Sequence, residues 1–235
     1  MNTCNDLIIN NVTKLYDKEH GIKSISTVIS SGEITAFIGP NGAGKTTLVN
    51  SIAGLTLITE GTITLSGIDT SSRICKSEIG YMQNDLSFYD KITVYEVLDF
   101  ICKVKFSGKY REEIDSYLQK YNLYEQRNSF IYELSLGMKR KLSIIMALIG
   151  TPKLILLDEP TNGVDTYGII QFKEDLITCS HRGSIIIVTS HVLDLLEKIC
   201  SRCIFLKNGA IAKDILLKQN NLCLENIYEE LYIFH

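Results

Sequence analysis

Short apolar runs rich in β-branched residues alternate with segments of helical periodicity along most of this 235-residue chain. Runs of this length are typical of buried strands, and apolar positions that recur every three or four residues are typical of amphipathic helices. The alternation predicts an α/β fold with a mostly parallel sheet covered on both faces. Strands are expected at LIINNV, EITAFIG, GTITLSG, IGYM, KLILLD, SIIIVTS and RCIFLKNG.

The strand pattern stops in the middle of the chain. Three successive segments there carry helical spacing, namely TVYEVLDFICKVKF, YREEIDSYLQKY and SLGMKRKLSIIMALIG. We therefore expect a single domain over residues 1–235, with an α/β core at 1–89 and 150–215. Residues 90–149 are expected to form an all-helical part, and 216–235 a short C-terminal tail.

Composition narrows the functional classes. A formal charge of −3 and a pI near 5.8 provide no basic field for a polyanion, so nucleic acid is a poor candidate partner. The apolar runs are far shorter than the ~20 residues of a membrane-spanning helix, and the N-terminus carries no export leader, so we expect a cytosolic protein without a span of its own. Seven cysteines, an odd number, favour free thiols, with Cys200 and Cys203 as small buried residues.

The strongest local motif is GPNGAGKTT, residues 39–47, directly after an apolar strand. It fits G-x-x-x-x-G-K-[ST], in which glycines let consecutive backbone N–H groups face phosphate oxygens at the start of a helix. Lys45 is expected to reach the β and γ phosphates of ATP, and Thr46 to bind Mg²⁺ through its hydroxyl. The expected phosphate-binding residues are Gly39, Asn41, Gly42, Ala43, Gly44, Lys45, Thr46 and Thr47.

A second motif, KLILLDEP, places two adjacent carboxylates at the end of a predicted buried strand. Such a pair is costly unless cations or water satisfy it, which favours function over packing. Asp158 is the candidate magnesium ligand, and Glu159 is the candidate base that polarises the attacking water. The alternative is an ordinary acidic residue at a helix N-terminus.

Together with LSLGM, LDEPTNGVD and TSHVLD, these motifs resemble the nucleotide-binding subunit of ATP-binding-cassette (ABC) transporters from Tyr16 to Gly209. The resemblance implies a RecA-like P-loop core, an antiparallel β subdomain and an all-helical signature subdomain. It also implies a head-to-tail dimer of identical or different cassettes around ATP and Mg²⁺. The partner would be a separate transmembrane permease, with the cassette peripheral on the inner face of the cell membrane.

The resemblance also assigns roles to single residues outside the two motifs. Tyr16 matches the aromatic that stacks on adenine, although alone it equally suits a half-exposed strand position. Asp165 matches the acid that communicates between the two sites, and His191 the histidine that contacts the γ-phosphate. The family's glutamine, a ligand for magnesium or its water, falls on Gln83 or Asn84, and both remain candidates.

The family's L-S-G-G-Q signature reads LSLGM here, at residues 134–138, which we call the signature segment. Ser135 is expected to cap the next helix and offer its hydroxyl to the γ-phosphate across the dimer, and Gly137 to bring its N–H close to the same phosphate. Leu136 is expected to begin an apolar packing stripe and to point away from nucleotide. Met138 should hold the ribose less firmly than glutamine does.

Three cations, Lys139, Arg140 and Lys141, follow in the first turns of that helix. Cations are unfavourable near a helix N-terminus unless an anion lies there, and the alternative is a solvated basic face.

The SLGMKRKL and TNGVD forms are similar to the branch that serves exporters of drugs and of peptide antibiotics such as bacitracin and lantibiotics. This analogy predicts an ATP-hydrolysing exporter subunit. Two alternatives stay open, a non-transport ABC ATPase such as an assembly factor, and an ATP-binding regulatory scaffold without turnover.

Overall fold

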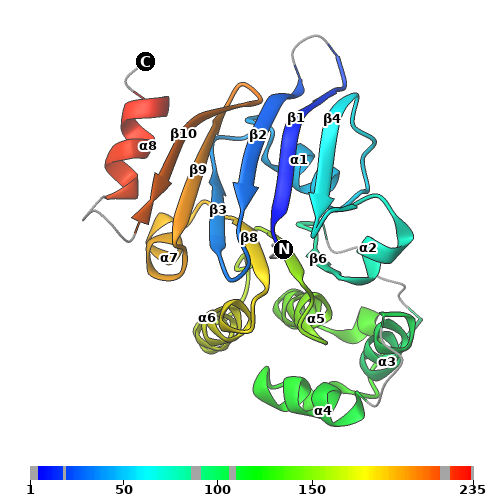
Figure 1. Ribbon diagram of the computed structural model, residues 1–235. Helices are drawn as coiled ribbons and strands as arrows, with labels where there is room; N and C mark the ends of the chain where they lie inside the picture. Colours follow the sequence, from blue (N-terminus) through cyan, green and yellow to red (C-terminus); the bar gives the residue numbers. More distant parts are fainter. Residues whose placement is uncertain (1–4, 18–19, 86–90, 106–109, 218–222, 234–235) are drawn as a thin grey trace.

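The computed structural model describes residues 5–17, 20–85, 91–105, 110–217 and 223–233 (Figure 1). Two sheets and a set of helices are arranged in layers. The strands are β1 (Leu7–Leu15), β2 (Gly21–Ile29), β3 (Ile34–Ile38), β4 (Glu60–Leu65), β5 (Ile68–Asp69), β6 (Ile79–Met82), β7 (Leu154–Asp158), β8 (Ile185–Thr189), β9 (Arg202–Lys207) and β10 (Ala210–Leu216).

The central layer is a six-stranded sheet in the order β10-β9-β3-β8-β7-β6. Every pair from β9 to β6 is parallel, and only β10 runs antiparallel to its neighbour. All residues of β3, β7 and β8 are buried, because this sheet is covered on both faces and its strands are continuous apolar runs. The register pairs Asp158 with Thr189 at the carboxyl ends of β7 and β8, where parallel α/β sheets bind their ligands.

A second sheet, in the order β2-β1-β4-β5, is antiparallel and packs over one face of the central sheet. Its strands alternate between buried and exposed positions where they meet the core. The first helix, α1 (Lys45–Ile52), belongs to the same layer, with Leu48, Val49 and Ile52 fully buried against Ile9 and Phe37. The predicted antiparallel β subdomain is therefore confirmed.

The other face of the central sheet is covered by helices, and Figure 1 shows α3 and α4 at the end of the molecule opposite α8. In the described parts of this region, residues 91–105 and 110–149, the regular structure is helical apart from one bridge between Thr93 and Phe130. The remaining helices are α2 (Arg73–Ser77), α3 (Val94–Lys105), α4 (Arg111–Lys120), α5 (Leu136–Leu148), α6 (Thr166–His181), α7 (Leu193–Ile199) and α8 (Leu224–Tyr232), with short 3-10 turns at Tyr124–Gln126 and Ile131–Glu133.

The α/β fold class is confirmed by this arrangement. At the end of the chain, β10 extends to Leu216, and α8 packs back toward α7 and the central sheet. Cys200 and Cys203 are both buried, as expected of core residues. Among the described helices, none combines the length and the apolar composition needed to cross a membrane.

Candidate functional site

The phosphate-binding motif lies where predicted, between β3 and α1. Gly39 passes close under β9, because a Cβ there would lie 2.5 Å from the Leu206 carbonyl oxygen. Gly44 has a φ of +102° and leads directly into Lys45, the first residue of α1. These two positions require glycine, and they bring a curved backbone to the N-terminus of a helix, where N–H groups face an anion.

Lys45 is buried in the same loop. Its Nζ donates to the Gly39 carbonyl at 2.6 Å and to the Pro40 carbonyl at 3.1 Å. Burial lowers the pKa of this ammonium, and the nearby Glu159 and Asp158 carboxylates oppose that shift. A cation held against its own phosphate-binding loop is well suited to neutralise a phosphate there.

Asp158 ends β7 and is held by two hydroxyl groups. Thr46 donates to Oδ2 at 3.0 Å, and Thr189 donates to Oδ1 at 2.5 Å. A cavity of about 330 Å³ opens beside it, lined by oxygen-bearing side chains that include both candidate amides. Hydroxyl, carboxylate and amide oxygens are the ligands that Mg²⁺ prefers, so the donor set fits this ion. The cavity is lined by Thr46, Asn50, Tyr81, Gln83, Asn84, Asp85 and Asp158.

Glu159 lies beside Asp158 in a left-handed backbone conformation with a φ of +51°, an unfavourable geometry for a residue with a side chain. Its N–H donates to both oxygens of Thr189, each at 3.1 Å, which fixes this turn. Burial raises the pKa of the carboxyl, and His191 and Lys45 oppose the shift. Strain of this kind is found where a side chain is held in place for chemistry.

His191 approaches Glu159 from the turn after β8. Its backbone N–H donates to Glu159 Oε2 at 3.3 Å, and its Nε2 lies 3.1 Å from Oε1. That second contact is an ion-pair distance without good hydrogen-bond geometry, so Oε1 accepts no hydrogen bond from the part of the chain described here. The imidazole is half exposed and lies within ion-pair distance of the buried carboxylate.

The signature segment begins α5. Ser135 caps the helix, with its Oγ accepting the Met138 N–H at 3.3 Å, as predicted. A Cβ at Gly137 would lie 2.9 Å from the Gly163 carbonyl oxygen, so the segment packs closely against the loop after β7. The expectation that Leu136 begins an apolar packing stripe was wrong, because its side chain is 65% exposed. It occupies the first position of α5.

Two of the three cations after the signature segment are buried and paired within the chain. Lys141 is buried, and its Nζ donates to Asp165 Oδ2 at 2.6 Å. Asp165 also caps α6 by accepting the Gly168 N–H at 2.7 Å. Arg140 is buried as well and donates to Asn84 Oδ1 at 3.1 Å. Arg140 and Lys141 are therefore not part of a solvated face, because their side chains pair with partners that lie far away in the sequence.

Tyr16 lies just after β1 and is 61% exposed. Lys14 Nζ lies 5.4 Å from the centre of its ring, within the range of a cation–π contact. The ring is therefore accessible for stacking, and the residue lies one position beyond the end of β1.

One neighbour of the phosphate-binding loop was not found from the sequence. The helix α8 contributes Tyr228 and Tyr232 to a cavity of about 720 Å³ that Asn41 and Gly42 also line. Tyr232 Oη donates to the Leu206 carbonyl at 2.8 Å. The same carbonyl oxygen lies close to Gly39. No sequence signal predicts this contact, because α8 follows the last recognisable motif.

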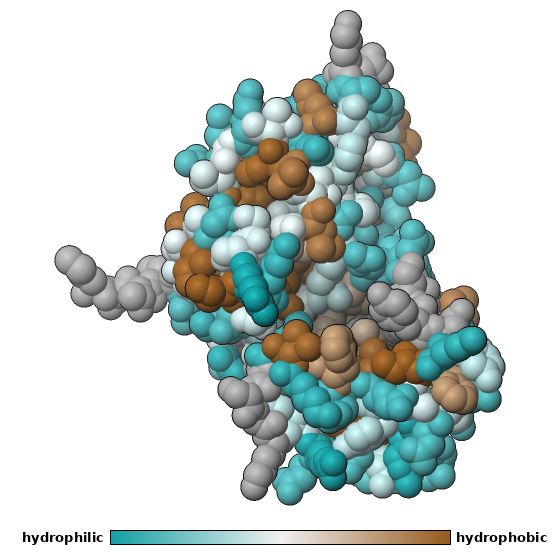
Figure 2. Space-filling model, turned by 90° about the vertical axis from the view of Figure 1, so that its right-hand side faces the viewer, coloured by the Kyte–Doolittle hydropathy of each residue, from teal (hydrophilic) through white to brown (hydrophobic). Residues whose placement is uncertain are grey.

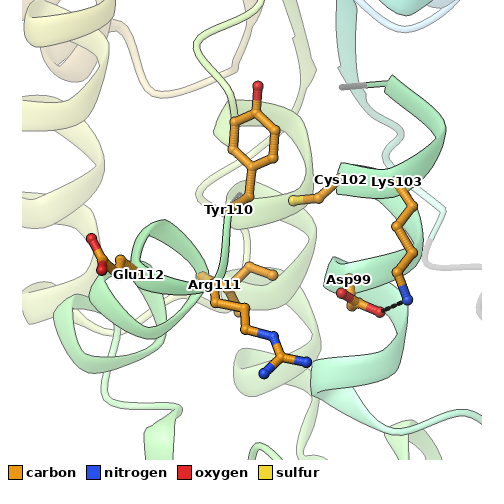
Figure 3. A pocket seen from close by; sticks show the side chains of 7 residues that line it. Asp99, Cys102, Lys103, Tyr110, Arg111 and Glu112 are labelled. Carbon is orange, nitrogen blue, oxygen red and sulfur yellow. Dashed lines mark ion pairs between the residues drawn. The ribbon is translucent and has the colours of Figure 1, made fainter. Parts of the chain in front are cut away.

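A separate cavity of about 600 Å³ lies between α3 and the start of α4 (Figure 3). Its rim carries the ion pair between Lys103 Nζ and Asp99 Oδ2, at 2.5 Å. Figure 3 shows the Glu112 carboxylate directed away from that pair. None of the predicted site residues lines this cavity, so it is not part of the phosphate-binding site.

A phosphate-binding loop, an oxygen-lined cavity beside Thr46 and Asp158, and a buried carboxylate in contact with a histidine define a P-loop nucleotide-binding protein. Comparison with known proteins gives the family. Residues 22–162 match the ABC transporter family, so the chain belongs to that family, as an ATP-binding cassette. ATP hydrolysis is the reaction of these proteins, and their cassettes form dimers and pair with membrane permeases.

Several curated relatives are similar over most of the chain. The bacitracin transport ATP-binding protein BcrA of Enterococcus faecalis is 31% identical, with 89% of this chain and 68% of that protein covered. The lantibiotic transport ATP-binding protein SrtF of Streptococcus pyogenes is 33% identical, with 87% and 88% covered. The lipopolysaccharide export protein LptB of Haemophilus influenzae is 31% identical, with the same coverage.

Solved structures agree with the fold. An ATP-binding subunit of an ABC transporter superposes with a TM-score of 0.91 at 25% identity, covering 96% of this chain and 98% of that one. A bacterial ABC transporter cassette, solved as a dimer, gives a TM-score of 0.81 at 25% identity, with 90% and 98% covered.

Proposed function

We propose that this chain hydrolyses ATP with Glu159 as the base and with Mg²⁺ held by Thr46 and Asp158. The observation that carries the proposal is the buried Glu159 carboxylate, strained at its backbone and held next to His191 and Asp158. Mg²⁺ supplies charge neutralisation on the β and γ phosphates when it is bound. Lys45 adds a second positive charge from within the loop, and His191 is placed to contact the γ-phosphate.

In the same proposal, the side-chain amide that binds Mg²⁺ or its water comes from the segment after β6. Gln83 and Asn84 both line the cavity beside Asp158, and the contact with Arg140 orients Asn84. Tyr16 is the candidate for adenine stacking. Ser135 and Gly137 serve the nucleotide of a second cassette, identical or different, and Asp165 links the two sites. The dimeric cassette that resembles this fold supports that arrangement.

We propose further that the partner is a separate permease and that the cassette is peripheral on the inner face of the membrane. Exposed apolar side chains on α2 and α3 support this. Phe100 and Val104 lie one turn apart on α3, and Ile74 lies on α2. Figure 2 shows apolar patches on this side of the molecule in both the core and the helical layer. Large exposed apolar side chains that gather on one face are typical of interaction sites.

The proposed cargo class is a peptide antibiotic or drug, carried outward. The relatives named for bacitracin and lantibiotic transport support this class, and the LptB relative supports export more generally. Because the cassette holds the nucleotide machinery, cargo contacts would lie on the permease.

The test combines turnover with membrane retention. Purified chain should hydrolyse ATP in Mg²⁺, and Glu159→Gln should abolish hydrolysis and trap an ATP-bound dimer on size exclusion. Co-expressed with a candidate permease, the wild-type chain should remain on washed membranes. ATP binding without turnover would indicate a regulatory scaffold instead. Co-purification with soluble proteins and no retention on permease membranes would indicate an assembly factor.

A further inference from the structure

Arg140 is a buried guanidinium with an incomplete set of partners. It lies in the second turn of α5 and is 8% exposed. Its Nη2 donates to Asn84 Oδ1 at 3.1 Å, whereas Nε and Nη1 are buried and donate no hydrogen bond to any described residue. Guanidinium donors that are buried without acceptors cost free energy, so such an arrangement requires a reason.

The charge around Arg140 supplies that reason. Burial alone lowers the pKa of the guanidinium, and Asp85, Asp158 and Glu159 oppose the shift in that order. Asp158 and Asp85 line the cavity beside Thr46, and Asn84 lines it too. Arg140 therefore bonds to an amide that lines this cavity, and carboxylates that line the cavity favour its charge, as they would favour that of a divalent cation.

We propose that Arg140 is a positioning residue that competes with Mg²⁺ for the side-chain oxygen of Asn84. Arg140 binds this oxygen when Mg²⁺ does not. This inference rests on the proposed function, in which Asn84 is a magnesium amide. An amide oxygen has two lone pairs, but two cations at one oxygen repel each other strongly in a partly buried site. Arg140 must therefore release Asn84 when the metal is bound.

Such competition connects two parts of one subunit. Arg140 lies about one turn after Gly137 on α5, and Ser135 caps the same helix. The Arg140–Asn84 bond ties this helix to the loop after β6. Loss of the bond on metal binding frees the signature segment from its own subunit's metal site, at the point when it has to engage a second cassette.

The experiment measures how much Mg²⁺ tightens nucleotide binding. A fluorescent ATP analogue is titrated into the wild-type chain in Mg²⁺ and in EDTA. The readout is the Kd in EDTA divided by the Kd in Mg²⁺, which is larger when Mg²⁺ tightens binding more. Arg140→Gln should raise this ratio by about tenfold, the size typical of groups that surround a metal ligand. Lys139→Gln removes a neighbouring cation on the same helix and should leave the ratio unchanged. Thermal unfolding of each variant checks that the fold is retained.

A second variant tests the shared oxygen directly and does not depend on a buried residue. Asn84 is exposed, and Asn84→Ala should lower the ratio. In that background Arg140→Gln should add little. An unchanged or lowered ratio in Arg140→Gln, or an unchanged ratio in Asn84→Ala, would overturn the competition. Failure of the proposed function is distinct, because the wild-type chain would then show no Mg²⁺-dependent ATP hydrolysis at all.

Discussion

Lys141 Nζ lies 2.6 Å from Asp165 Oδ2, so an ion pair joins the signature helix α5 to the residue that caps α6. The two partners are buried to very different degrees. The Lys141 side chain is 8% exposed, and that of Asp165 is 59% exposed. Loss of the aspartate charge leaves a buried ammonium without a counter-ion, whereas loss of the lysine leaves a carboxylate that water can solvate.

The first prediction is therefore an asymmetry in stability. Asp165→Asn keeps a side-chain oxygen to cap α6 but removes the charge, and we expect it to lower the free energy of unfolding by about 1–3 kcal/mol. Lys141→Met keeps the buried stem volume and should cost less than about 1 kcal/mol. Urea unfolding at neutral pH measures both. Equal losses, or a larger loss in Lys141→Met, would contradict the unequal burial of the pair.

The same pair predicts a pH dependence. The hydrogen bond from Lys141 is the main cause that lowers the pKa of Asp165, and the Gly168 N–H adds to it. A carboxyl with a lowered folded-state pKa stabilises the fold above its ordinary value near 3.8, and this contribution is lost as the pH falls through the folded-state pKa. The stability difference between wild type and Asp165→Asn should be constant near neutrality and shrink below about pH 4. Urea midpoints from pH 7 to pH 3 provide the check.

The third prediction concerns two neighbouring residues of the signature segment, Gly137 and Leu136, and their effect on formation of the dimer. A methyl group at Gly137 would press on the Gly163 backbone carbonyl at 2.9 Å, so Gly137→Ala should displace the loop after β7. We expect loss of the ATP-driven dimer, measured by size exclusion in the Glu159→Gln background, with a folded monomer retained. Leu136→Ala is the matched control, because its exposed side chain leaves no cavity when it is shortened. If Leu136→Ala also prevents dimer formation, an apolar contact from Leu136 is part of the interface.

The parts of this site that the sequence predicts are those built from adjacent residues. Gly39 to Thr47 and the pair Asp158–Glu159 carry their own strand, turn and helix context, so the location of the phosphate-binding loop and the acids follows from local pattern. Arg140 and Lys141 are different. Their partners lie 56 and 24 residues away, and no periodicity indicates which distant side chain a buried cation will meet.

Leu136 shows a related limit. Apolar residues at helical spacing predict a buried face, but the first residue of a helix has no preceding turn to pack on. The strain at Glu159 is likewise invisible in the sequence, since only the fold fixes its positive φ through Thr189.

The final prediction concerns the close packing of α5 on the central sheet. Gly80 lies in β6, and a Cβ there would lie 1.8 Å from the Ala147 carbonyl oxygen of α5, so helix and strand would have to separate. Gly80→Ala should lower the free energy of unfolding by about 3 kcal/mol, as other overpacking substitutions do. Gly67→Ala is the control, since it has a φ of +79° with open space around it and should cost only about 1 kcal/mol. Similar losses in the two variants would show that α5 can move away from β6 at little cost. In that case α5 would be free to shift with the signature segment rather than being fixed by the sheet.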